Sequence, residues 1–171
     1  MKPEIFMDDF ERTEDGDRLF SSLGRALTLA TRFESNCRGL AAILQLTSNP
    51  SAVLETDEAL KEFSGKLYKR SLNQHIKSSV VAESELHKLL DRARIARNEI
   101  AHELPLGLCS QDGINYLGED VDAGIKELVA TIAEADRAVC FVLTDITNDH
   151  MPTNEFLKSY VDRATAWVCE E

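Results

Sequence analysis

Apolar residues recur at helical spacing along nearly the whole chain, and this pattern constrains the fold more than any other feature. The longest stretch covers roughly residues 16–47, where apolar side chains return every three or four positions and form one stripe. A break follows at residues 48–51, which include a proline. Proline and glycine, the residues least suited to helix interiors, number only 4 and 8 among 171 residues. The pattern predicts an all-α protein.

Four more helices are expected after the first. The second begins near Asp57, with Thr56 as its N-cap, and its buried face continues through Leu72 and Ile76 to a break at Ser78-Ser79. The others are expected at roughly residues 83–103, 119–148 and 153–169. The sequence thus favours an antiparallel bundle of about five helices. It also favours a short irregular or β-hairpin insertion near residues 105–118, where Asp112-Gly113 resembles a hairpin turn.

Length and composition bound the class of protein. A chain of 171 residues favours one domain, here an acidic arm at residues 1–14 followed by the helical bundle at residues 15–171. The arm has no apolar run of the signal-peptide kind, and no stretch of the chain is apolar enough to predict a membrane span. The four cysteines are widely separated, which fits a reducing cytoplasm and predicts neither a metal site nor a disulfide framework. A net charge of −11 disfavours general nucleic-acid binding.

One motif concentrates polar chemistry inside a helix. Arg97, Asn98 and His102 lie late in the third expected helix, in the segment Arg-Asn-Glu-Ile-Ala-His. On a helical wheel Arg97 falls within the apolar stripe, so its permanent charge requires an acceptor. Glu34 and Asp136 are misplaced charges on the apolar faces of two other helices, and we expect one of them to reach Arg97.

The same wheel separates Arg97 from His102. At about 100° per residue the two side chains lie roughly 140° apart. In one straight helix they would not close on a single atom. They would cooperate if the helix ended near His102, or if two copies of the protein met face to face.

Two interpretations of the motif remain open. His102 has a side chain that moves protons near neutral pH, Arg97 suits the charge on a phosphate, Asn98 suits positioning, and Arg94 is placed to meet an RNA backbone. Together they favour phosphodiester chemistry on RNA without a metal or other cofactor. In the alternative, Arg97 only pairs with a buried carboxylate, and His102 interacts with the end of its helix.

The segment from Arg97 to His102 resembles the signature of the HEPN superfamily, in which an arginine, an adjacent polar residue and a following histidine lie late in a helix of an all-helical domain. The resemblance covers this motif and a compatible helix layout over about residues 16–169. It implies a metal-independent endoribonuclease of the toxin–antitoxin, defence or RNA-processing kind, with Arg97, Asn98 and His102 as catalytic residues. It also implies a homodimer with its active site between subunits, and a cognate antitoxin or a nucleotidyltransferase-like protein as partner.

The resemblance leaves a second function open, because some members of the superfamily are non-catalytic dimeric modules that bind a nucleotide or a partner protein. Residues outside the motif suggest less. His75, His87 and His150 have no companions at ligand spacing, and we expect them at the surface. Tyr160 and Trp167 are expected to be packing residues.

Overall fold

The protein is an all-α bundle, as the sequence predicts. The computed structural model describes residues 14–48, 50, 56–105 and 121–170. Within them the chain forms six α-helices and one π-helical turn. The elements are α1 (Glu14–Ser48), α3 (Asp57–Tyr68), α4 (Leu72–Ser79), α5 (Glu85–Asn98), η1 (Glu99–Glu103), α7 (Val121–Thr147) and α8 (Asn154–Cys169).

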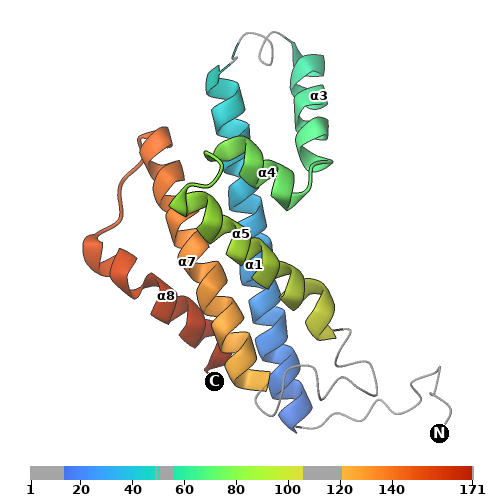
Figure 1. Ribbon diagram of the computed structural model, residues 1–171, viewed down its shortest axis with the longest axis vertical. Coiled ribbons are helices and arrows are strands. Elements are labelled where there is room, and N and C mark those ends of the chain that lie inside the picture. The colour runs from blue at the N-terminus through green and yellow to red at the C-terminus, as the bar shows by residue number, and fades with distance from the viewer. Residues whose placement is uncertain (1–13, 49, 51–55, 106–120, 171) are drawn as a thin grey trace, which may run out of the picture.

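The four long helices alternate in direction along the chain. In Figure 1, α1 and α7 both begin at the lower end of the bundle, whereas α5 and α8 run the opposite way. The parallel course of α1 and α7 also follows from three contacts that share a separation of 104 residues, namely Arg18–Asp122, Arg32–Asp136 and Asn36–Cys140. Helices consecutive in this series are therefore antiparallel, as in an up-down-up-down bundle.

The core lies where α1, α5 and α7 meet. Its largest fully buried side chains include Phe33 and Leu40 of α1, Leu90 of α5 and Ile132 of α7. Leu90 and Ile132 belong to the apolar stripes that the sequence shows, and burial of such stripes is the main stabilising contribution to a bundle. The helix α8 packs on α7, and α4 packs on α1.

The second expected helix is in fact two helices, α3 and α4. The chain therefore breaks between Tyr68 and Leu72, before the predicted break at Ser78-Ser79. Thr56 caps α3 as expected, accepting a hydrogen bond from the Ala59 amide at 3.1 Å. However, α3 ends at Tyr68, and α4 begins at Leu72. The cause is a capping box, in which Ser71 and Gln74 satisfy each other's backbone amides. The chain turns before α4, and this turn places α4 across the C-terminal half of α1 (Figure 1).

Several sequence expectations fall outside the described residues. The β-hairpin expected near residues 105–118 lies outside the described residues except for Pro105. The acidic arm expected at residues 1–14 lies outside them except for Glu14. Pro105 itself is described and is still helical. Within the described ranges, no helix has the length and hydropathy that a membrane span requires. The same ranges hold no group of three or more side chains suited to binding a metal ion.

Candidate functional site

The guanidinium of Arg97 is the centre of the candidate site. Its Nη2 donates to Oε2 of Glu34 at 2.5 Å, and its Nη1 donates to Oδ1 of Asn98 at 3.1 Å. Nε2 of His102 lies 3.4 Å from the same Nη1. All three predicted catalytic residues are therefore in contact within one chain, and Glu34 is the carboxylate that the apolar position of Arg97 requires.

A π-helical turn brings His102 to Arg97. From Glu99 to Glu103 the chain leaves the α-helical pattern, and the Leu104 amide donates to the carbonyl of Glu99, five residues earlier. Residues five apart are neighbours along such a turn, whereas an α-helix separates them. Arg97 and His102 therefore meet within one chain, with neither the helix end nor the second subunit that the sequence analysis considered. Single π-turns inside α-helices are rare and frequently mark functional sites.

The site is half-open to solvent. The side chains of Arg97 and Glu34 are 24% and 20% exposed. His102 is exposed, while its neighbour Ile100 on the same turn is buried in the core. The packing of Ile100 and Leu104 thus anchors the π-turn and presents His102 to solvent beside a guanidinium that is already held in place.

Glu34 joins a second arginine to the site. Its Oε1 lies 3.5 Å from Nη2 of Arg38, one turn further along α1, so the carboxylate lies between two guanidinium groups. Arg38 in turn stacks over the ring of Tyr68 at 4.8 Å from the centroid. One carboxylate and two guanidinium groups leave this cluster with one net positive charge, which suits a phosphate.

Asp136 and Arg94, which the sequence analysis also associated with the motif, do not belong to this cluster. Asp136 is fully buried and bonds to Arg32 at 3.1 Å, Asn36 at 2.7 Å and Tyr160 at 2.5 Å instead of reaching Arg97. Arg94 donates to Asp91 at 2.7 Å, three residues earlier on α5. Among the described residues, no hydrogen bond or ion pair joins Arg94 to the motif. The expectation that Glu34 or Asp136 pairs with Arg97 is thus met by Glu34 alone.

His75 is buried, so the expectation of a surface position was wrong. Its side chain is 0% exposed, and neither ring nitrogen has a hydrogen-bond partner among the described residues. Burial lowers the pKa of His75, and the positive charges of Arg38 and Arg70 lower it further, whereas the negative charge of Glu34 has a smaller raising effect. The break between α3 and α4 turns His75 toward the core. The sequence analysis assumed one continuous helix and therefore did not predict that His75 is buried.

Acid is expected to destabilise the protein through His75. Because the folded-state pKa is lowered, the unfolded chain binds the proton more readily, and stability falls as the pH drops below the ordinary value of 6.5. Between pH 7.5 and 5.5 the loss from this group is at most about 1.4 kcal/mol. Urea unfolding at both pH values measures it. His75→Phe should reduce the loss and His150→Gln, an exposed histidine, should not; equal losses in all three proteins would contradict the assignment.

The described cysteines are poor nucleophiles. Burial raises the pKa of Cys37, and the charges of Asp136 and Glu34 raise it further. Burial likewise raises the pKa of Cys140 and Cys169. A thiol with a raised pKa holds little thiolate at neutral pH. Thiolate chemistry at these three positions is therefore disfavoured.

Comparison with known proteins gives no relative. No family model, no curated protein and no solved structure matches the chain. The function must therefore be argued from the geometry of the Arg97 cluster and from the motif itself.

Proposed function

We propose that the protein is a metal-independent endoribonuclease whose reacting groups are Arg97 and His102. The observation that carries the proposal is the exposed Nε2 of His102 at 3.4 Å from the Arg97 guanidinium. A proton-transferring imidazole beside a fixed cation is the pair of groups that phosphodiester cleavage requires. The resemblance of this segment to the HEPN signature supports the same function.

The proposed reaction is an internal transfer on RNA. The ribose 2′-oxygen attacks the adjacent phosphorus, the bond from phosphorus to the 5′-oxygen of the next nucleotide breaks, and a cyclic phosphate remains. The 2′-hydroxyl gives up its proton to a base, and the leaving 5′-oxygen takes one from an acid. His102 serves one of these two roles, Arg97 binds the phosphate oxygens as negative charge grows, and Asn98 holds Arg97 through its side-chain oxygen.

A homodimer would supply a second histidine. The reaction needs an acid and a base at once, and each chain carries one His102. Two sets of Arg97 and His102 facing each other would provide both roles and two guanidinium groups for one phosphate. The superfamily resemblance supports this arrangement, and a cognate antitoxin would act by covering the shared cleft.

RNA cleavage in EDTA tests the proposal. The wild type is expected to cut a mixed RNA pool and leave cyclic phosphate ends, and His102→Ala is expected to lower the rate about 10²–10⁴-fold, the usual effect of losing an acid–base catalyst. His150→Ala, which removes an exposed histidine outside the site, is the matched control. The proposal fails if the wild type cuts no RNA, or if His102→Ala cuts at the wild-type rate.

A non-catalytic binding module is the second candidate. The overall charge of −11 and the engagement of Arg97 by Glu34 favour it, because both weaken the attraction for an RNA chain. In that case the net positive cluster binds a single nucleotide phosphate or an acidic partner protein. Binding of a nucleoside monophosphate that is lost in Arg97→Ala, in a protein that cuts no RNA, would favour this function.

A further inference from the structure

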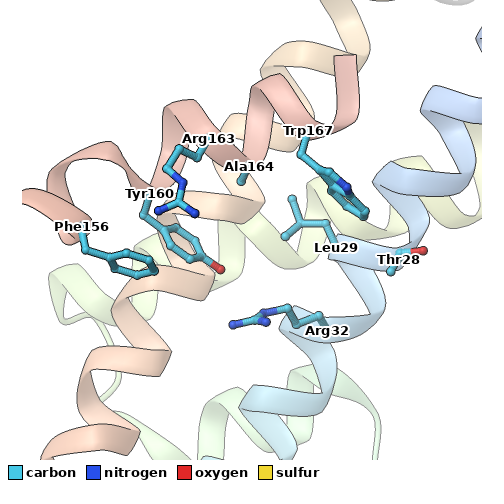
Figure 2. A pocket seen from close by; sticks show the side chains of 8 residues that line it. All are labelled: Thr28, Leu29, Arg32, Phe156, Tyr160, Arg163, Ala164 and Trp167. Carbon is cyan, nitrogen blue, oxygen red and sulfur yellow. The ribbon is translucent and has the colours of Figure 1, made fainter. Parts of the chain in front are cut away.

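A pocket lies between α1 and α8 and shares no residue with the Arg97 cluster. It has a volume of about 410 Å³, which is in the range of small-molecule sites. Figure 2 shows Leu29 and Arg32 on α1 facing Phe156, Tyr160, Arg163 and Trp167 on α8. Aromatic and apolar surface with a few polar groups is the usual composition of a ligand site.

The pocket is positively charged in an acidic protein. Aspartate and glutamate outnumber lysine and arginine by 30 to 19 in the chain, yet the residues lining the pocket include two arginines and no carboxylate. Asp136 lies directly beneath, fully buried, and accepts hydrogen bonds from Nε of Arg32 and from the hydroxyl of Tyr160. Asp136 therefore neutralises Arg32, and Arg163 leaves the pocket with one net positive charge.

The hydrogen bonds of Arg32 fix the position of its guanidinium and leave Nη1 without an acceptor among the described residues. Nε is held by Asp136 at 3.1 Å and Nη2 lies 3.8 Å from Sγ of Cys140. Burial lowers the pKa of Arg32, but the charge of Asp136, together with Tyr160 and the hydrogen bonds to Cys140 and Asp136, raises it above its ordinary value. No acceptor among the described residues binds Nη1, so this donor is available where the guanidinium projects between the helices (Figure 2).

Aromatic surface remains uncovered around these charges. Trp167 is 50% exposed and Phe156 is 39% exposed, so the expectation that Trp167 is a packing residue was only half met. The guanidinium of Arg163 lies over the Phe156 ring at 5.1 Å from its centroid. Phe156 and Trp167 lie at opposite ends of the pocket (Figure 2). A flat ring stacked on the exposed face of Trp167 would bury aromatic surface and place its charged substituent near Arg32 and Arg163.

We infer that this pocket binds a small aromatic monoanion, a flat ring with one acidic substituent. Trp167 recognises the ring, and Arg163 and the free Nη1 of Arg32 recognise the acidic group. The single net charge of the pocket selects a monoanion over a dianion, because a second negative charge would meet the buried Asp136 without a compensating cation. The inference is independent of the RNA chemistry proposed for Arg97 and His102.

Phenylacetate is a suitable probe, and Trp167 reports its binding. Trp167 is the one tryptophan of the sequence, so the tryptophan fluorescence of the full-length protein comes from the pocket itself. Phenylacetate at millimolar concentration is expected to change this fluorescence saturably. Phenylacetamide, which is the neutral counterpart, and acetate, which lacks the ring, should bind more weakly. Phenyl phosphate distinguishes a carboxylate from a dianionic phosphate ester as the preferred group.

Variants separate the pocket from the rest of the surface. Arg163→Gln is expected to weaken phenylacetate binding about tenfold or more, the usual effect of losing a charged hydrogen bond. Lys158→Gln, an exposed cation on the same helix outside the lining, should not change it. Trp167→Ala is measured by calorimetry and should also bind more weakly. Circular dichroism establishes that each variant is folded.

Three results would overturn the inference. The first is a wild-type protein whose Trp167 fluorescence is unchanged by phenylacetate. The second is equal binding of phenylacetate by the wild type and Arg163→Gln. The third is a Trp167 fluorescence that depends on protein concentration and is the same with and without each probe. This result would identify the pocket as a contact between copies of the chain.

Discussion

Replacing Asp136 by alanine is expected to lower the free energy of unfolding by about 3 kcal/mol, because the carboxylate is the shared acceptor of a buried network. The side chain is 0% exposed and accepts from Arg32, Asn36 and Tyr160. Without it, the Asn36 amide and the Tyr160 hydroxyl lose an acceptor in a partly buried environment. Arg32 is 56% exposed and can turn to water, which limits the loss. For a chain of this size the melting temperature should fall by roughly 6–12 °C.

Asp122→Ala is the matched control. Asp122 lies in the first turn of α7 and, like Asp136, pairs with an arginine of α1 (Arg18, at 3.4 Å), but its side chain is 61% exposed. An exposed pair contributes about 0–1 kcal/mol, so this variant should melt close to the wild type. Asp136→Asn keeps one acceptor oxygen and should fall between the two. Thermal melts of Asp136→Ala and Asp122→Ala that coincide would show that the Asp136 network does not stabilise the fold.

The sequence identifies both key carboxylates but does not assign their partners. Glu34 and Asp136 each interrupt an apolar stripe, and each is held by an arginine in the structure. What decides the pairing is the register of α1 against α7, which places Arg32 and Asn36 opposite Asp136 and leaves Glu34 to face Arg97. That register depends on how three helices pack together, and single-helix periodicity does not contain it.

The contact between Arg97 and His102 was beyond the reach of a helical wheel. The wheel assumes about 100° per residue throughout, and it predicted the buried positions of Ile100 and Leu104 correctly. It failed for His102 because the backbone adds a π-turn, in which residues five apart become neighbours. Local sequence preferences do not distinguish a π-turn from an α-turn, so the wheel could not place His102 beside Arg97.

Arg97→Ala is expected to abolish most RNA cleavage, by about 10²–10³ in kcat, if the guanidinium stabilises charge in the transition state. Arg97→Lys should restore little of this activity. A lysine ammonium is a compact point charge, and it cannot keep Glu34, Asn98 and a phosphate as simultaneous partners in the way a planar guanidinium can. Steady-state kinetics on a short RNA measure kcat and KM separately. Arg18→Gln, which removes an exposed arginine at the far end of α1, controls for the loss of charge.

Arg94→Ala separates the role of Arg94 from that of Arg97, its neighbour one turn along α5. The guanidinium of Arg94 is paired with Asp91. We therefore expect Arg94 to attract the RNA backbone and not to contact the phosphate that reacts. The variant should raise KM in a salt-dependent way and leave kcat near the wild-type value. A fall in kcat as large as that of Arg97→Ala would place Arg94 in the reaction itself.

Glu34 is expected to act through Arg97, and a double variant tests this. Glu34→Gln removes the charge that holds Nη2 of Arg97 while it keeps the size of the side chain, so kcat should fall by about tenfold as the guanidinium loses its fixed position. In a protein that already carries Arg97→Ala, the same change should have no further effect on kcat, because contacting residues that work as a unit are not additive. Additive losses would mean that Glu34 takes part in the reaction independently, and its place between Arg97 and Arg38 would then need a chemical role of its own.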